Sequence, residues 1–309
     1  MRALGLGDFL TAIPALRALA IALPDHRRVL AAPTVLEPLV RLSGTVDEVV
    51  DTAPLAALDR RLHHADVAVN LHGRGPLSHR VLLAASPRRL IAFAHPEIPQ
   101  SAEGPPWAAG EHEVRRWCRL LRASGIPADP TDLDLQPPSG DPHGATVIHP
   151  GAASPARRWP VERWAEVARH EVAHGNRVVV TGSATERPLA TQVAERAGLP
   201  PSAVLAGTTD LLGLAGTIAG AGLVLCGDTG VAHLATAFAT PSVVLFGPTS
   251  PALWGPPPGR PRHVALWAGE TGDPHGTEPD PGLLRITVDD VLAARQRSGE
   301  PSTSTMRST

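Results

Sequence analysis

The sequence contains neither lysine nor tyrosine, so all 28 of its basic residues are arginine. The absence of lysine excludes Schiff-base chemistry on a lysine amine, and a phosphate-binding site must therefore use arginine or backbone amides. Acidic residues number 30, which gives a formal charge of −2 and no concentrated basic field of the kind that binds nucleic acid. We therefore expect no nucleic-acid partner and at most peripheral contact with a membrane.

Cysteine is scarce and long apolar runs are missing. Cys118 and Cys226 are far apart and stand in no redox or metal-ligand spacing, and the 14 histidines show no zinc-type spacing. We therefore predict no metal and no other cofactor. No apolar run reaches the roughly 18 residues of a membrane-spanning helix, and no charged-then-apolar leader opens the sequence. These features predict a reduced, cytoplasmic environment.

The alternation of short and long apolar segments predicts an α/β fold. Short β-branched runs alternate with amphipathic stretches, which is typical of βα units around parallel sheets. Strands are expected at 28–32, 48–51, 67–71, 90–93, 145–149, 177–181, 223–226 and 242–246. Helices are expected at 11–22, 35–42, 77–85, 111–123, 161–173, 186–197, 231–239 and 288–296.

Composition predicts where the domains divide. Residues 128–144 are rich in proline, aspartate and glycine and read as a linker. We predict two doubly wound, Rossmann-like domains facing a cleft, with boundaries at 1–138 and 139–296, and a disordered tail at 297–309.

The first domain lacks room for its first strand. The segment GLGDFLTAIPALRALA reads as a loop entering a helix, and such a loop follows a strand in this kind of domain. Only Met1–Leu4 precede it, fewer than the about five or six residues of a typical strand. Either the strand is vestigial or the translation start has been placed too late, and we expect the second.

The most informative segment is LVLCGDTGVAHLATAFATPSVVLFGPTSP, residues 223–251. An apolar strand runs into Gly227 and Asp228, and a helix begins at once. First-turn amides and the helix dipole favour an anion there, and the small residues Thr229 and Gly230 allow close approach. His233 lies one turn further on. The alternative is that Asp228 and Thr229 only cap the helix and that His233 is structural.

Two further segments combine glycine with charge. In HPGAASPARRWPVERWAEVA (149–168), Arg157 and Arg158 follow a glycine-containing loop, which suits a diphosphate leaving group, or they form a solvated pair. In GLGDFLTAIPALRAL (5–19), Asp8 lies near a helix start. It can accept a proton from an acceptor hydroxyl or simply cap the helix.

Weaker candidates lie elsewhere. NLHGRGPLSHR (70–80) places His72 and Arg74 at a strand end, where they are candidate acceptor contacts. Glu186 follows a strand and can bond a ribose hydroxyl or lie in the first turn of a helix. No third glycine completes a dinucleotide fingerprint after Gly5 and Gly7, which separates the chain from simple Rossmann dehydrogenases.

Taken together and in this order, the segments GDFLTAIPALRAL, HPGA…ARRWPVERW and GDTGVAHLATAFATPSVVLFGPTSP resemble glycosyltransferase family 9, the bacterial ADP-heptose:lipopolysaccharide heptosyltransferases. The resemblance runs from Gly5 to about Arg295. It implies a GT-B fold in which residues 1–138 bind the acceptor and residues 139–296 bind the nucleotide-sugar. It further implies an inverting, metal-independent transfer of heptose or a related sugar to a hydroxyl of a glycan, lipid-linked or small-molecule acceptor.

The resemblance also assigns roles to residues. Asp8 falls on the catalytic base, and Arg157 falls on a donor-contacting basic residue that is usually lysine. Glu186 matches a nucleoside-contacting acid. The residues that fall around the donor sugar and diphosphate are Asp228, Thr229, Gly230 and His233.

Two rival functions remain open at this stage. The first is a nucleotide-sugar-binding protein without transfer activity, which would bind nucleoside diphosphate and form no product. The second is a nucleotide-sugar epimerase of GT-B fold, which would change the donor sugar without an acceptor. The paired acids and histidines of an acid–base epimerase are not evident in the sequence, so we rank this rival last.

Overall fold

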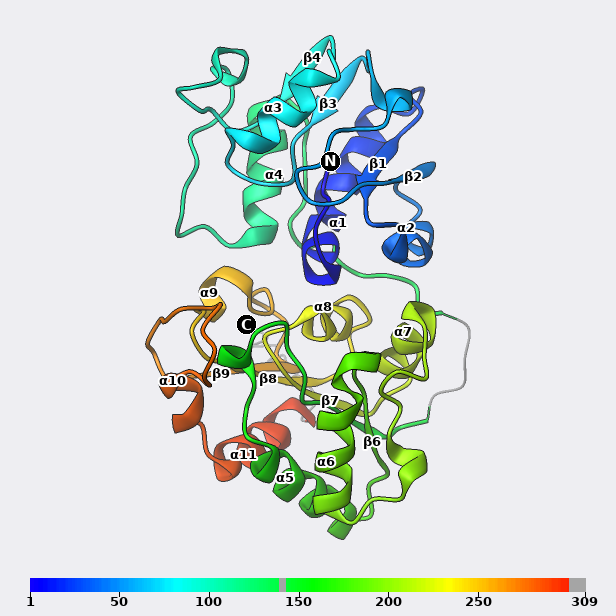
Figure 1. The fold of residues 1–309 in the computed structure, drawn as a ribbon, viewed down its shortest axis with the longest axis vertical. Coiled ribbons are helices and arrows are strands. Elements are labelled where there is room, and N and C mark those ends of the chain that lie inside the picture. The colour runs from blue at the N-terminus through cyan, green and yellow to red at the C-terminus, as the bar shows by residue number, and fades with distance from the viewer. Residues whose placement is uncertain (139–142, 300–309) are drawn as a thin grey trace, which may run out of the picture. The chain divides into compact units, whose positions relative to one another are not determined.

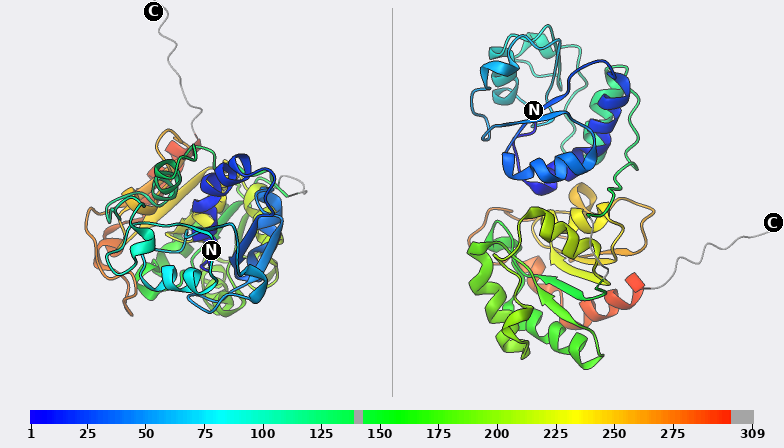
Figure 2. Two further views of the ribbon diagram at one scale, coloured as in Figure 1. Left: turned by 90° about the horizontal axis from the view of Figure 1, so that it is seen from above. Right: turned by 90° about the vertical axis from the view of Figure 1, so that its right-hand side faces the viewer.

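The computed structural model describes residues 1–138 and 143–299. The described residues form two compact units, one that ends at Gln136 (unit 1) and one that begins at Pro137 (unit 2) (Figures 1 and 2). Part of the predicted linker, residues 139–142, lies outside the described residues. Residues 297–299 of the predicted tail belong to the last helix, and residues 300–309 lie outside the described residues.

The strands and helices alternate along both units. The strands are β1 Val29–Ala32, β2 Glu48–Asp51, β3 Val67–Val69, β4 Arg89–Ile91, β5 Thr146–His149, β6 Val178–Val180, β7 Leu223–Gly227, β8 Ser242–Phe246 and β9 His263–Trp267. The α-helices are α1 Leu6–Ala22, α2 Glu37–Ser43, α3 Leu77–Ala84, α4 Glu113–Ala123, α5 Val161–Ala173, α6 Arg187–Ala197, α7 Leu211–Ala219, α8 Gly230–Ala237, α9 Pro251–Trp254, α10 Pro281–Arg285 and α11 Val288–Gly299. Short 3₁₀ helices are η1 Thr34–Leu36, η2 Arg60–Leu62, η3 Pro99–Ser101, η4 Pro155–Arg157, η5 Ala184–Glu186 and η6 Pro201–Ala203.

Unit 2 is built on one parallel sheet with the strand order β6-β5-β7-β8-β9. Val204 adds a bridge to the outer side of β6. The chain therefore moves outward from β5 to Val204 and then crosses back to β7 on the other side of β5. This is the Rossmann strand order, and its reversal lies between β5 and β7. The predicted α/β class with parallel sheets is confirmed.

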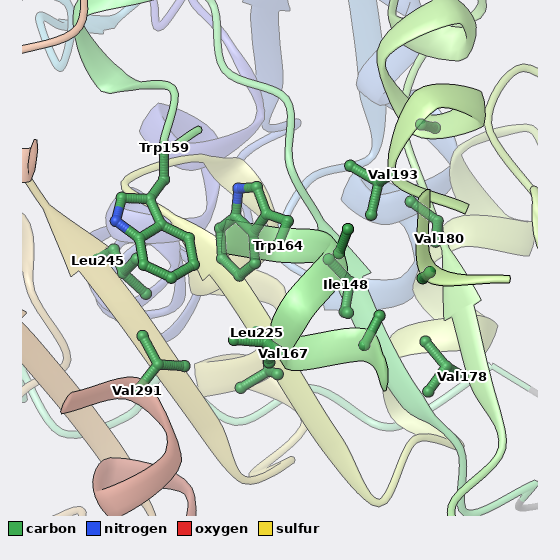
Figure 3. Packing of buried hydrophobic residues seen from close by; sticks show 14 of the residues in the cluster. Ile148, Trp159, Trp164, Val167, Val178, Val180, Val193, Leu225, Leu245 and Val291 are labelled. Atoms are coloured by element: carbon green, nitrogen blue, oxygen red, sulfur yellow. The ribbon is translucent and has the colours of Figure 1, made fainter. Parts of the chain in front are cut away.

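Helices cover both faces of this sheet. Helices α5, α6 and α11 pack on one face, and α7 and α8 pack together on the other, as Figure 1 shows. The first face holds the larger core, in which the side chains of Ile148, Leu225 and Leu245 meet the rings of Trp159 and Trp164 (Figure 3). The two rings lie edge to face with centroids 4.9 Å apart. A sheet buried on both faces explains why its strands are continuous apolar runs.

Truncating Trp164 should destabilise the protein strongly. The side chain is 1% exposed, and Trp164→Ala leaves a large cavity, which we expect to cost about 3–5 kcal/mol of unfolding free energy. Chemical denaturation monitored by circular dichroism measures this change. Val172→Ala on the same helix, where the side chain is 47% exposed, is the control and should change stability by less than about 0.5 kcal/mol. Equal effects of the two substitutions would contradict the packing described for this core.

Unit 1 contains two pairs of parallel strands, β1 with β2 and β3 with β4. Residues Met1 and Arg2 connect the two pairs. The Arg2 nitrogen donates to the carbonyl of Ala31 in β1 (3.0 Å), and the Leu71 nitrogen, just past β3, donates to the Met1 carbonyl (3.1 Å). The N-terminal segment thus lies where the central strand of a Rossmann-like sheet belongs, although it forms no assigned strand.

Helix α1 begins earlier than the sequence pattern predicts. It starts at Leu6 rather than at 11, and Gly5 occupies the N-cap position in an extended conformation. Asp8 is therefore in the first helical turn and is not the N-cap residue, which corrects one of the two sequence interpretations. Helix α1 packs against α4, which follows the remaining strands of the unit.

Several elements were not predicted. Helix α7 contains two glycines, Gly213 and Gly216, which weaken its helical pattern; its N-cap is Asp210, whose carboxylate accepts from the Gly213 amide. Strand β9 is a half-exposed edge strand that lacks the buried run of its neighbours. Among the described residues, no helix is long and apolar enough to cross a membrane.

Candidate functional site

The strand order of unit 2 places two of the predicted segments side by side. His149 at the end of β5 pairs with Cys226 near the end of β7. The loops that follow these two strands therefore leave the sheet together at the point where the strand order reverses. Ligands of open α/β sheets bind at this point, beyond the carboxyl ends of the strands.

Arg157 and Asp228 meet at this edge. The Arg157 guanidinium donates to the Asp228 backbone carbonyl (3.3 Å), and its Nη1 lies 3.9 Å from a carboxylate oxygen of the same residue. A side chain at Gly227 would press on the Arg157 carbonyl, since an added Cβ would lie 3.1 Å from it. For Arg157 Nε we find no hydrogen-bond partner within 1–138 or 143–299. That nitrogen is itself buried, but the Arg157 side chain as a whole is 23% exposed, so the guanidinium can contact an anion at the surface.

Burial raises the pKa of Asp228 to about 6, and the nearby Arg157 charge offsets only part of the rise. The residue is 7% exposed, so its ionised form loses most of its hydration. Two opposite charges at 3.9 Å form a loose pair that a ligand can open. At this separation the Asp228 carboxylate neutralises the Arg157 charge less completely than it would in a tight ion pair.

Helix α8 directs its first turn to the same place. Thr229 is the N-cap, and its hydroxyl oxygen accepts from the Val231 amide (3.3 Å). Thr229 therefore caps the helix, while its hydroxyl proton stays available for an anion. Gly230 is the first helical residue, and its missing side chain leaves the amides accessible. His233 lies one turn on, with its ring 6.0 Å from that of Trp254 in an edge-to-face contact.

Glu186 forms a second charged position beside the β5 loop. Its carboxylate accepts from the amide and the hydroxyl of Ser183 (both 2.8 Å), which makes a capping box at η5. An added Cβ on Gly151 would lie 2.2 Å from a Glu186 oxygen, so a side chain at 151 would displace this carboxylate from its present position. Burial by itself would raise the pKa of Glu186, but the Ser183 hydrogen bonds and the charges of His149 and Arg158 lower it overall. Glu186 is ionised and held in place.

In unit 1 the corresponding point of the sheet carries Asp8. The Arg2 guanidinium, 1% exposed, lies 3.2 Å from the Asp8 carboxylate and 3.0 Å from that of Glu113. It also donates to the backbone carbonyls of Asp8 and Leu71. Trp117 donates its indole N–H to the same Glu113 oxygen at 2.9 Å. One buried cation is therefore shared between two carboxylates.

This arrangement sets the proton affinity of Asp8. Burial raises its pKa, the Arg2 charge lowers it, and the Glu113 charge raises it again, with a net rise above the ordinary value. The Asp8 side chain is still 29% exposed, so it can reach a substrate. A partly buried carboxylate with a raised pKa beside a fixed guanidinium suits a general base.

The two weaker candidates in unit 1 differ in their surroundings. His72 is half-buried, and burial together with the Arg2 charge and the N-terminal charge lowers its pKa to about 4, so its ring is neutral at pH 7. The ring Nδ1 of His72 has no hydrogen-bond partner in the part of the chain that the structure describes. Arg74 is exposed. Their predicted contact with an acceptor stays a prediction.

The sequence did not single out Arg2 or Glu113. Arg2 lies in the short segment that precedes the first motif, and Glu113 opens α4, 111 residues later. The one available signal was that Arg2 is a charged residue where a buried strand was expected, and that Glu113 is a charged residue in an expected amphipathic helix. Within 1–138 and 143–299 the structure brings together no group of three or more metal-ligating side chains.

The titration of Asp228 predicts a change of stability with pH. Its folded-state pKa lies near 6 and above its ordinary value, so between about pH 4 and 6 the folded state holds a proton that the unfolded chain has released. The stability linked to this carboxyl is fully present below about pH 4 and is lost as pH rises through 6. Asparagine does not titrate, so Asp228→Asn does not lose this stability as pH rises. The unfolding free energy of the variant minus that of the parent should therefore increase with pH, by at most about 3 kcal/mol.

Urea unfolding of both proteins at several values between pH 4.5 and 7.5 measures this difference. Asp289→Asn, at an exposed position in the first turn of α11, is the control and should follow the parent at every pH. Parallel pH profiles for Asp228→Asn and the parent would show that Asp228 titrates normally.

Two Rossmann-like units in one chain, the second with arginine and a helix N-terminus at its strand reversal, are the architecture of GT-B glycosyltransferases. The chain belongs to glycosyltransferase family 9 (heptosyltransferase), whose family model matches residues 105–280, more than half of the sequence. The predicted family and fold are confirmed.

Individual relatives agree with this membership. Lipopolysaccharide heptosyltransferase 1 of Pseudomonas aeruginosa is 35% identical over 158 residues, which are 48% of this chain and 44% of that protein. The chain thus matches less than half the length of this relative. Among solved structures, a family 9 glycosyltransferase from Veillonella parvula superposes with a TM-score of 0.75 at 18% identity, covering 95% of this chain and 94% of its own. The E. coli ADP-heptose LPS heptosyltransferase II gives 0.72 at 22%, covering 94% and 95%.

Proposed function

We propose that the protein transfers heptose or a related sugar from a nucleoside-diphosphate sugar to an acceptor hydroxyl. The observation that carries the proposal is the meeting of Arg157, the Thr229 hydroxyl and the first-turn amides of α8 at the strand reversal of unit 2. These groups offer hydrogen-bond donors and positive charge to a diphosphate. Relatives named as heptosyltransferases, one of them for ADP-heptose, support ADP as the nucleotide.

The transfer proceeds by a single displacement with inversion. Asp8 takes the proton of the acceptor hydroxyl, and the oxygen attacks the anomeric carbon of the donor. The bond between that carbon and the diphosphate oxygen breaks, and its electron pair leaves with the nucleoside diphosphate. Arg157 and the amide of Gly230 stabilise the charge on this leaving group in place of a metal ion.

The other parts of the donor have their own contacts. Glu186, ionised and fixed opposite Gly151, accepts hydrogen bonds from the ribose hydroxyls. Asp228 and His233 lie beside the sugar, and the acceptor, a glycan or lipid-linked or small molecule, contacts His72 and Arg74 of unit 1. The relatives named as lipopolysaccharide heptosyltransferases support a lipopolysaccharide-type glycan as the acceptor.

The experiment that tests the proposal is a binding and product assay on the purified protein. We expect ADP to raise the melting temperature more than GDP, UDP or CDP, with no change on adding magnesium or a chelator. Incubation with ADP-heptose and a heptose-free lipopolysaccharide core should give an acceptor heavier by one heptose in mass spectrometry. Binding without product would favour the binding-protein alternative, and a shift that depends on magnesium would contradict the metal-independent mechanism.

A further inference from the structure

Glu113 is a buried carboxylate to which the proposed transfer gives no role. It opens helix α4 and is 5% exposed, so its side chain is closed off from a substrate. Its Oε1 accepts from Arg2 Nη2 (3.0 Å) and from the indole N–H of Trp117 (2.9 Å), and its Oε2 accepts from Arg116. The first turn of a helix and two guanidinium groups all stabilise the charged form of a carboxylate. Glu113 is therefore a fixed negative charge beside Arg2.

The Nη2 of Arg2 has more acceptors than hydrogens. The other two nitrogens of the guanidinium donate to the backbone carbonyls of Asp8 and Leu71. Nη2 faces three side-chain oxygens, those of Glu113 (3.0 Å), Asp8 (3.2 Å) and Thr11 (3.2 Å). Because Nη2 carries two hydrogens, these three acceptors must share them. Glu113 is the nearest of the three, so it draws on a cation that would otherwise serve the Asp8 carboxylate alone.

The four charged side chains of this cluster balance when Asp8 is ionised. Arg2 reaches Asp8 from the N-terminal segment, and Glu113 acts on it from α4, with Arg116 on the second oxygen of Glu113. His72, which follows β3, has a neutral ring at pH 7. A proton on Asp8 removes one of the two negative charges beside Arg2. Glu113 then remains as the counter-ion, which avoids a buried guanidinium without a partner charge.

The surroundings of Glu113 hold it in place. The side chain of Arg116 is 8% exposed, and its guanidinium lies 4.2 Å from the centroid of the Trp107 ring. Arg116 also donates to three backbone carbonyls of the loop before α4, those of Ala108, Ala109 and Glu111. Trp117 is 1% exposed, and its ring packs on that of Phe93 with centroids 5.8 Å apart. Both donors that flank Arg2 on the Glu113 carboxylate are thus fixed, so this charge cannot follow Arg2 if the guanidinium moves.

We propose that Glu113 is a positioning residue for the proton transfer to Asp8: it holds Arg2 in common with Asp8, and in this way it strengthens Asp8 as a base. The proton of the acceptor hydroxyl moves to an Asp8 carboxylate oxygen, the ion pair of Arg2 with Asp8 becomes a hydrogen bond to a neutral acid, and the ion pair of Arg2 with Glu113 persists. The role in catalysis rests on the proposed function, whereas the electrostatic coupling of Glu113 to Asp8 rests on the contacts of Arg2 alone.

The test measures the pH dependence of turnover in Glu113→Gln with ADP-heptose and a heptose-free lipopolysaccharide core. Without the Glu113 charge, Arg2 acts on Asp8 alone, so Asp8 should lose its proton at lower pH and be a weaker base. We expect the acid limb of the kcat profile to move to lower pH by on the order of one unit. On the plateau, kcat should fall by about three- to tenfold, and the KM for ADP-heptose should stay within about twofold of the parent.

Trp117→Phe is the matched structural control. It removes the indole donor from the same oxygen of Glu113 and leaves every charge of the cluster in place. Its melting temperature should fall, because the buried indole is truncated, but the acid limb of its kcat profile should coincide with that of the parent. If the two variants move the acid limb equally, Glu113 acts through packing, and the proposal is overturned.

A second readout does not depend on turnover. Carbon NMR of protein labelled at the aspartate Cγ follows the titration of Asp8, whose signal is the one that Asp8→Asn lacks. The midpoint of this titration should move to lower pH in Glu113→Gln, and an unchanged or raised midpoint overturns the proposal. The double variant Glu113→Gln/Arg116→Gln leaves no guanidinium at 116 without its carboxylate, and it should shift the midpoint in the same direction, because Glu113 contacts Arg2 directly.

The remaining outcomes separate this proposal from the proposed function. If neither glutamine variant folds while Trp117→Phe does, Glu113 has a purely structural role and the proposal is overturned. If the parent forms no heptosylated product but the Asp8 midpoint shifts as expected, the proposed transfer is contradicted and the coupling of Glu113 to Asp8 is supported.

Discussion

Replacing Asp8 by asparagine lowers turnover by about 10²–10⁴-fold and leaves nucleoside-diphosphate affinity within about twofold of the parent. The amide keeps the size of the carboxylate and can still contact Arg2, but it cannot accept the acceptor's proton. Because Arg157 and the first turn of α8 belong to unit 2, the proposed donor contacts do not involve the Asp8 side chain. Steady-state rates with ADP-heptose, together with calorimetric titration of ADP, separate the two quantities.

The raised pKa of Asp8 adds a pH signature to this experiment. The parent's turnover should fall as pH drops through a pKa that is higher than that of an ordinary carboxyl, because the protonated group is no base. Asp66→Asn, at an exposed residue of unit 1 whose carboxylate forms a surface ion pair with Arg88, is the control and should keep full activity. Normal turnover with weakened ADP binding in Asp8→Asn would place Asp8 in the donor site and remove it as the base.

Replacing Arg157 by glutamine is the second large effect. We expect kcat/KM to fall by about 10²–10³-fold, because in the proposed mechanism the guanidinium stabilises the charge that develops on the leaving diphosphate. The substitution also leaves the Asp228 carboxylate without its nearby positive charge, so its pKa should rise above 6. The affinity for ADP should fall together with the rate, unlike the result expected for Asp8→Asn.

Two further variants test whether the effect comes from the guanidinium of Arg157: one keeps the charge at 157, and the other removes an arginine elsewhere. Arg157→Lys keeps the charge and should retain activity within about tenfold of the parent, although a lysine cannot make the forked contacts of a guanidinium. Arg169→Gln on α5 removes an exposed guanidinium that donates to the Arg196 carbonyl, and it should leave both the rate and the affinity unchanged. If the glutamine variant at 157 retains parent activity, the diphosphate binds elsewhere.

Much of unit 2 could be predicted from the sequence, because its elements carry strong patterns. Val161–Ala173 and Ser242–Phe246 have the predicted bounds, the first from its amphipathic period and the second from its β-branched run. Helix α7 and strand β9 could not be predicted in the same way. The first depends on packing against α8 to offset its glycines, and the second is half-exposed at the edge of the sheet.

The features of the candidate site also fall into those that a local sequence pattern predicts and those that depend on contacts between distant residues. The positions of Thr229 and Gly230 follow from a strand that runs directly into a helix, which is a local pattern. The contact between Arg157 and Asp228 joins residues 71 positions apart, and it depends on the order of the strands. Glu186 could be placed beside a strand from the sequence, but its fit against Gly151 depends on the missing Cβ. Local chemistry was therefore predictable, whereas contacts across the sheet were not.

The buried Arg2 guanidinium also orders events during synthesis. Arg2 is synthesised before its partners Leu71 and Glu113, which follow 69 and 111 residues later. At about 5–20 residues per second, the charge waits on the order of ten seconds for the second carboxylate. Until then, burying it would leave it without the Glu113 charge, which is costly in an apolar interior. Unit 1 therefore closes late, and pausing of translation before residue 113 should prolong the time that its nascent core remains open to chaperones.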